Sequence, residues 1–227
     1  MKGQQLPLSV QLRESASFDS FFAGPNEAAV SALRQPQSSV LIYGALNSGR
    51  THLLQAVARA NSGAYLPMAE IREMGPEVLE GLEHNALLCI DDLDSVSNHR
   101  AWSMTLLRLL DTLHAQGAGV VLASSAAPDR MEIVLPDLRT RLMRAAIFGL
   151  KPLSDDDRNQ LLRERAQARG LELAPEVSRW LLTQLARDTG SLLAALEQLD
   201  RASLSAKRRL TLPFVQSVLA PGTSQIN

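Results

Sequence analysis

Short apolar runs alternate with amphipathic patterns over residues 18–151. The runs predict buried strands, because each is brief, apolar and bounded by glycine or polar residues; they lie at 38–44, 63–68, 85–92, 119–125 and 146–150. Apolar residues recur at helical spacing in the segments between them, at 51–61, 75–84, 101–117 and 135–145, and a short helix is predicted after Gly24-Pro25. This alternation predicts an α/β fold with a parallel five-stranded sheet flanked by helices.

The pattern changes after Lys151-Pro152, because only helical periodicity follows, at 154–170, 174–188, 190–208 and 211–219. Ser154 precedes three aspartates, which suits the start of a helix. We therefore predict three parts: a loosely ordered tail over residues 1–17, an α/β domain over 18–151 and a small all-α domain over 152–227.

Composition excludes several classes of protein. Lysine and arginine number 23 against 24 acidic residues, so no strong net field draws the chain to nucleic acid or to an anionic membrane. No run is long and apolar enough for a signal peptide or a membrane span. The single cysteine, Cys89, excludes internal disulfides and a cysteine-based zinc site and is expected in the core. We expect a soluble cytoplasmic protein without membrane contact.

The segment GALNSGRT has the spacing of a phosphate-binding loop and lies between a predicted strand and a predicted helix. Glycines allow backbone N–H groups to surround phosphates, the helix directs its positive end at them, and threonine reaches Mg²⁺. A glycine-rich turn without a ligand is also common in α/β proteins. The candidate nucleotide contacts are Gly44, Ala45, Leu46, Asn47, Ser48, Gly49, Arg50 and Thr51.

The run LLCIDD adds a second signal, because it ends a predicted strand with two carboxylates. Asp91 would hold Mg²⁺ together with Thr51, and Asp92 would polarise an attacking water. Paired aspartates can also simply end a strand and cap the next segment. A phosphate loop about 40 residues upstream favours the nucleotide interpretation.

Two substitutions weaken the case for fast hydrolysis. Arg50 stands where the loop pattern has lysine, and a planar, forked guanidinium does not replace a compact ammonium. Asp92 is one methylene shorter than the usual glutamate. We therefore expect this site to hold a nucleotide tightly and to turn it over poorly.

Taken together, the segments FDSFFAGPNEAAV, GALNSGRT, LLCIDD, VVLASS and LPDLRTRLMRA resemble the AAA+ core of the DnaA family of replication initiators. The head QLPLSV and the tail LEQLDRASLSAKRRLTLPFVQSVL resemble the Hda branch of that family, which switches initiation off. The resemblance covers roughly residues 4–219. It implies an AAA+ domain followed by a helical lid, and bound ADP (or ATP) with Mg²⁺. It also implies further nucleotide contacts from Phe21, Phe22, His52 and Ser125.

Three arginines, Arg139, Arg141 and Arg144, lie on the predicted helix at 135–145. From the residues alone they could all be surface arginines. The resemblance implies that Arg141 is an arginine finger that enters the nucleotide site of a partner, ATP-bound DnaA, and converts it to ADP-bound DnaA. Such a finger accelerates hydrolysis roughly 10³–10⁵-fold. The other two arginines are expected on the surface.

The head peptide contains Gln5, Leu6 and Leu8. Its aliphatic residues could fold back on the protein, or lie extended in an apolar groove of a partner. The resemblance implies the second, with the sliding clamp (the beta subunit of DNA polymerase III) as the partner.

The lid departs from the family pattern, because Gly190 stands where an arginine usually faces the phosphates, and Arg187 lies almost one turn earlier. The chain ends at Asn227 without the DNA-reading domain of initiators, so DNA contact should be indirect or weak. A finger and a nucleotide site on one chain also permit self-association.

The function expected from the sequence is regulatory inactivation of DnaA by a protein that is not itself an efficient ATPase. An autonomous AAA+ ATPase, such as a helicase loader or motor, is the rival, and a passive clamp-binding scaffold is a third possibility.

Overall fold

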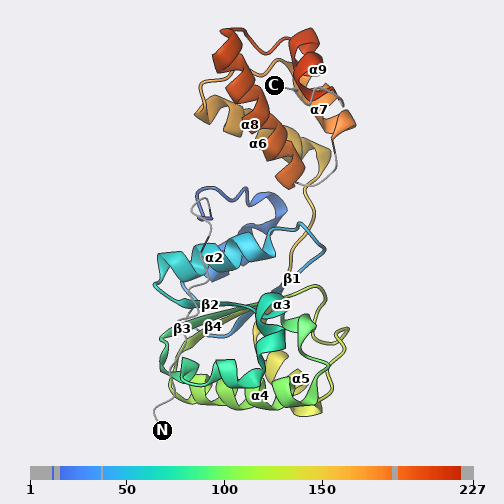
Figure 1. Cartoon of the computed structure of the whole chain (residues 1–227). Coiled ribbons are helices and arrows are strands. Elements are labelled where there is room, and N and C mark those ends of the chain that lie inside the picture. Colours follow the sequence, from blue (N-terminus) through green and yellow to red (C-terminus); the bar gives the residue numbers. More distant parts are fainter. Residues whose placement is uncertain (1–11, 13–15, 37, 186–188, 221–227) are drawn as a thin grey trace. The chain divides into compact units, whose positions relative to one another are not determined.

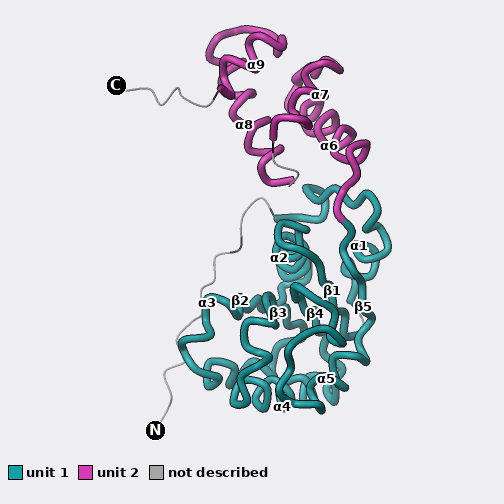
Figure 2. The backbone as a smooth tube through the Cα atoms, turned by 90° about the vertical axis from the view of Figure 1, so that its right-hand side faces the viewer, with its two compact units in different colours: residues 1–151 teal, residues 152–227 magenta. Residues whose placement is uncertain are grey.

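The structure, a computed structural model, describes residues 12, 16–36, 38–185 and 189–220. It divides into two compact units, residues 1–151 and 152–227 (Figure 2). The division falls where the sequence pattern changes from alternating strands and helices to helices alone. The predicted head peptide, with Gln5, Leu6 and Leu8, lies outside the described residues, and so does Arg187.

The first unit is built on a parallel five-stranded sheet of order β2-β3-β4-β1-β5. Its strands are β1 (Val40–Tyr43), β2 (Ala64–Pro67), β3 (Leu87–Asp91), β4 (Gly119–Ser124) and β5 (Ala146–Gly149). All five fall within the predicted runs. The parallel order brings the carboxyl ends of β1, β3 and β4 side by side, and candidate functional residues follow each of these strands.

Helices cover both faces of the sheet (Figure 1). One face carries α1 (Glu27–Arg34) and α2 (Arg50–Ala60), and the other carries α4 (Arg100–Ala115) and α5 (Pro136–Leu142). Adjacent strand residues alternate between the two cores, so that Ile42 and Cys89 pack with α2 whereas Leu41 and Ile90 pack with α4. Buried apolar residues on both faces explain why the strands are continuous apolar runs rather than alternating ones.

The helix predicted at 75–84 is wrong. That segment forms two 3₁₀ turns, Pro76–Leu79 and Leu82–His84, after the short helix α3 (Met68–Ile71) and a further turn at Arg72–Met74. Gly75 and Gly81 adopt φ of 89° and 84°, values outside the right-handed helical region, so a continuous helix cannot pass through them.

The second unit contains α6 (Asp155–Ala168), α7 (Pro175–Gln184), α8 (Thr189–Ala206) and α9 (Leu212–Leu219) around its own apolar core. Ser154 caps α6 as predicted: its hydroxyl accepts from the Asp157 N–H, and the Asp157 side chain accepts from the Ser154 N–H. The Ser154 hydroxyl also donates to the Asp157 carboxylate, and this hydrogen bond, followed by the one from the Ser154 N–H, lowers the pKa of Asp157. Among the residues that the structure covers, no helix has the length and apolar character needed to cross a bilayer.

Candidate nucleotide-binding site

The predicted phosphate loop joins β1 to α2, so that its backbone N–H groups collect at the start of a helix. Gly49 is the N-cap of α2 and has φ of 93°, and a Cβ added there would lie 2.6 Å from Cε2 of Phe21. Asn47 also has a positive φ of 63°. At the other end of the loop, the Gly44 N–H donates to the Ser124 carbonyl on β4. The loop therefore has the backbone conformation that an anion site at a helix N-terminus requires.

Arg50 is the first residue of α2 and is only 9% exposed. Its Nη2 lies 3.8 Å from Asp92 Oδ1, whereas its Nη1 is buried and makes no hydrogen bond; the buried hydroxyl of Ser48 is likewise unpaired. A buried guanidinium with an unused donor is costly unless an anion completes its contacts. These two donors therefore fit the phosphates of a nucleotide.

The two carboxylates at the end of β3 differ in environment. Asp91 is 1% exposed, and its Oδ1 accepts the Asp92 N–H at 3.0 Å. Asp92 adopts φ of 50° and is partly exposed. Burial and the neighbouring Asp91 raise the pKa of Asp92, while Arg50 acts in the opposite direction. Asp91 is thus held in the interior, and Asp92 faces the phosphate loop through its ion pair with Arg50.

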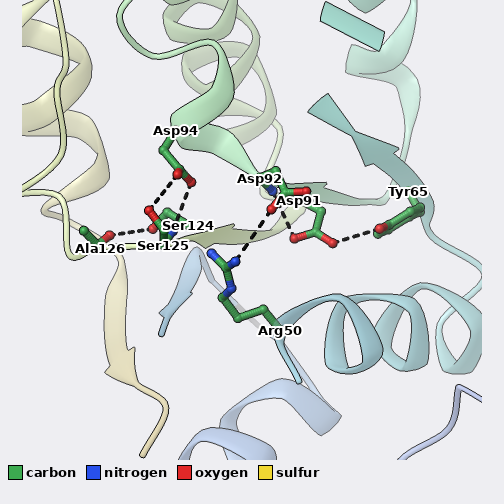
Figure 3. Close-up of polar contacts among 8 residues, drawn as sticks. All are labelled: Arg50, Tyr65, Asp91, Asp92, Asp94, Ser124, Ser125 and Ala126. Atoms are coloured by element: carbon green, nitrogen blue, oxygen red, sulfur yellow. Dashed lines mark hydrogen bonds and ion pairs between the residues drawn. The ribbon is translucent and has the colours of Figure 1, made fainter. Parts of the chain in front are cut away.

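Sequence reasoning missed Tyr65, whose hydroxyl donates to Asp91 Oδ2 at 2.8 Å within the core (Figure 3). Burial, followed by the charge of Asp91, raises the pKa of Tyr65 far above its usual range, so the hydroxyl keeps its proton. A tyrosine near the end of a short apolar strand was the available signal. Nothing in the local sequence indicated that β2 would pair with β3 and bring the two side chains together.

The polar residues at the end of β4 and directly after it form hydrogen bonds within the protein. The Ser125 N–H and hydroxyl both donate to the carboxylate of Asp94, at 3.0 and 2.7 Å, and the Ser124 hydroxyl donates to the Ala126 carbonyl (Figure 3). Asp94 was not singled out by the sequence. A contact between Ser125 and a nucleotide, as predicted, would have to replace these hydrogen bonds.

The segment before α1 packs against the phosphate loop. His52 Nε2 lies 2.9 Å from the Ser17 carbonyl and 3.1 Å from the Ser20 hydroxyl, and the Phe21 ring lies 5.7 Å from the imidazole. Phe22 is partly buried beside Phe21. Phe21 and His52, both predicted as nucleotide contacts, therefore lie at the loop, whereas Leu46 within the loop is 83% exposed.

The three arginines of the predicted finger helix have different environments. Arg139 is partly buried rather than a surface residue as predicted, because it donates to the carbonyls of Pro128 and Met131. Arg141 forms an ion pair with Asp111 of α4 and keeps 22% of its side chain exposed. Arg144 is exposed. All three lie on or next to α5, which covers the sheet face opposite to α2 (Figure 1). Arg141, paired with Asp111 of α4, therefore lies on a different face of the unit from the helix that follows the phosphate loop.

The structure thus brings the phosphate loop together with Asp91, Asp92, Phe21 and His52. Arg141 lies on another surface of the unit. The described residues contain no cluster of three or more histidine, cysteine, aspartate or glutamate side chains able to hold a metal by themselves. The joint binding of Mg²⁺ by Thr51, Asp91 and the phosphates of a nucleotide stays a prediction.

The second unit is similar in sequence to a known protein family. Residues 155–219 match the family model described as the Hda lid domain. The second unit is therefore similar to the lid domain of Hda. The match covers α6 to α9 and confirms, at the lid, the resemblance to the Hda branch seen in the sequence.

Solved structures show the fold of the chain. Domain III of the replication initiation protein DnaA from Thermotoga maritima aligns with a TM-score of 0.74 and 20% identity, over 92% of this chain and 98% of that one. A replication initiator DnaA bound to AMPPCP and single-stranded DNA aligns with a TM-score of 0.68 and 20% identity, over 87% and 69%. The T. maritima RuvB branch-migration motor aligns with a TM-score of 0.61 and 14% identity, over 92% and 72%. The predicted AAA+ fold with a helical lid is therefore confirmed.

Proposed function

We propose that this protein inactivates the replication initiator DnaA by stimulating hydrolysis of the ATP bound to it. The Hda lid match over residues 155–219 carries this proposal, because the chain then combines a lid similar to that of Hda with a DnaA-like AAA+ fold. The position of Arg141, away from the chain's own phosphate loop, supports an action on the site of another molecule.

Arg141 supplies the chemistry in this proposal. A guanidinium placed at the γ-phosphate neutralises charge that develops during hydrolysis, and this is worth roughly 10³–10⁵ in rate. In the structure Arg141 is paired with Asp111, whose side chain is 47% exposed. An ion pair this exposed to solvent contributes only about 0–1 kcal/mol, so the phosphates of a partner could readily replace Asp111.

The chain's own site binds ADP or ATP with Mg²⁺ in a structural role and hydrolyses ATP poorly. Two DnaA neighbours are described as bound to AMPPCP, which supports a nucleotide in this fold. Arg50 forms an ion pair with Asp92, the residue that would have to activate water. Asp94 accepts hydrogen bonds from the N–H and the hydroxyl of Ser125. These contacts favour retention of a nucleotide over turnover.

The remaining parts of the proposal rest on the sequence. Gln5, Leu6 and Leu8 would dock on the sliding clamp and so restrict inactivation to active replication in the cytoplasm. The protein would contact DNA only indirectly, through the clamp, or weakly.

The deciding experiment follows conversion of labelled ATP on DnaA in the presence of clamp loaded on DNA. The protein should accelerate conversion, and Arg141→Ala should abolish the acceleration while ADP binding persists. The matched control is Arg144→Ala, which removes an exposed arginine one turn away and should keep full stimulation.

Two outcomes would contradict the proposal. Full stimulation by Arg141→Ala would refute the finger assignment. No stimulation of DnaA, combined with steady ATP turnover by the protein alone, would favour an autonomous AAA+ ATPase such as a motor or helicase loader.

A further inference from the structure

Tyr65 connects the second strand of the sheet to the carboxylate predicted to hold Mg²⁺. It lies on β2, is 9% exposed and donates its hydroxyl hydrogen to Asp91 Oδ2 at 2.8 Å. The Gln55 side chain on α2 forms a hydrogen bond to the same hydroxyl. The contact therefore lies between the sheet and the helix that follows the phosphate loop.

Asp91 is held at both of its oxygens. Tyr65 contacts Oδ2, and the Asp92 N–H donates to Oδ1 at 3.0 Å. Figure 3 shows these contacts as a chain that runs from Tyr65 through Asp91 and Asp92 to Arg50. Since the two hydrogen bonds act on different oxygens, they fix the rotation of the carboxylate about its side-chain bonds. A carboxylate has about four acceptor positions, so two remain for another ligand.

The pairing of β2 with β3 explains how this arrangement arises. Tyr65 is in register with Cys89, and Pro67 with Asp91, so Tyr65 and Asp91 are diagonal neighbours on one face of the sheet. Side chains at such diagonal positions reach each other when one is long and aromatic. A phenylalanine at position 65 would fill the same space but leave Asp91 Oδ2 without its donor.

We propose that Tyr65 is a positioning residue that holds Asp91 in the orientation from which it binds the Mg²⁺ that accompanies a nucleotide. Partners of this kind orient metal-binding carboxylates, and their loss typically weakens metal affinity about 10–100-fold. The inference rests on the nucleotide-binding part of the proposed function and is independent of any action on DnaA.

The alternative is that Tyr65 only satisfies a buried carboxylate and stabilises the core. The two roles differ in one measurable respect. A positioning role changes how much Mg²⁺ strengthens nucleotide binding, whereas a structural role changes stability or nucleotide affinity irrespective of Mg²⁺.

The test measures binding of a fluorescent ADP analogue to the full chain, once with Mg²⁺ and once with EDTA. Tyr65→Phe should lower the strengthening by Mg²⁺ roughly 10-fold and leave the affinity in EDTA unchanged. The matched control is Tyr43→Phe. Tyr43 is the chain's other tyrosine, lies on β1 with its ring beside Gly149, and should behave as wild type. In an Asp91→Asn background, Tyr65→Phe should have no further effect.

Each other result overturns the inference, and the results are distinguishable. If wild-type protein binds the analogue equally with and without Mg²⁺, the predicted metal site fails together with its positioning residue. If Mg²⁺ strengthens wild-type binding and Tyr65→Phe retains that effect, only the role of Tyr65 fails. If Tyr65→Phe weakens binding of the analogue by the same factor with Mg²⁺ and with EDTA, its role is structural. If its affinity in EDTA is unaltered, the variant is folded.

Discussion

At the scale of single residues, Asp92 illustrates how burial and neighbouring charges set the ionisation of a carboxylate. Its carboxylate lies beside two groups with opposite effects, the buried charge of Asp91 and the guanidinium of Arg50. Burial and Asp91 prevail, so the pKa of Asp92 is raised. A raised pKa means that the ionised form is disfavoured in the folded protein, and ionisation of Asp92 therefore lowers the stability of the fold.

This sign leads to a prediction for Asp92→Asn. The folded state binds a proton at Asp92 more tightly than the unfolded state does, so stability falls as pH rises from the unfolded value of 3.8 through the raised folded pKa. The neutral amide should therefore raise the free energy of unfolding at pH 7. The gain should be below about 1 kcal/mol, because the side chain is 39% exposed and solvent screens its charge.

Urea unfolding at several pH values measures this effect, and the advantage of the variant should shrink as the pH falls towards 4. The control is Asp129→Asn at an exposed position, which should leave the free energy of unfolding unchanged at every pH. A destabilised Asp92→Asn at pH 7 would mean that the ion pair with Arg50 outweighs the repulsion from Asp91.

At the scale of elements, helix α5 carries two arginines that differ in role although they are two residues apart. The Arg139 guanidinium donates to the carbonyls of Pro128 and Met131 and so ties the loop after β4 to the helix. Arg141 has a carboxylate partner on α4 and keeps part of its side chain in solvent. The helix itself is anchored by Leu138 and Leu142, which are both buried.

We therefore predict that Arg139→Ala lowers stability, because it leaves two backbone carbonyls without their charged donor. The expected loss is about 1–3 kcal/mol in urea unfolding. Arg144→Ala, at an exposed position, should be neutral in the same measurement. Equal stability of the two variants would show that the Arg139 contacts contribute nothing to the fold.

At the scale of the whole molecule, the two units have separate apolar cores, and each contains one tryptophan. Trp102 is buried in the first unit, and Trp180 packs against the core of the second. The phosphate loop and both carboxylates belong to the first unit, and Gly190 of the second unit has no side chain to offer a phosphate. Nucleotide binding should thus stabilise chiefly the first unit.

Single-tryptophan variants test this prediction. In Trp180→Phe the remaining Trp102 reports the first unit, and in Trp102→Phe the remaining Trp180 reports the second. ADP with Mg²⁺ at 100 times its Kd should raise the free energy of unfolding reported by Trp102 by about 2.7 kcal/mol. It should raise the free energy of unfolding reported by Trp180 by less. Equal shifts would show that the nucleotide stabilises both units as one.

The sequence by itself determined the features that depend on local periodicity and spacing. The five strands, the phosphate loop from Gly44 to Thr51, the acidic end of β3 and the cap at Ser154 all follow from neighbours along the chain. The helix wrongly expected at 75–84 shows the limit of periodicity, because Gly81 with its positive φ interrupts it.

Only the tertiary structure decided which distant residues meet. The contacts of Tyr65 with Asp91, Asp94 with Ser125 and Arg141 with Asp111 each join residues 26 to 31 positions apart. They depend on the strand order β2-β3-β4-β1-β5 and on the packing of α4 against α5. Local patterns specify which face of an element is buried, but the partner on that face is chosen by the arrangement of the whole domain.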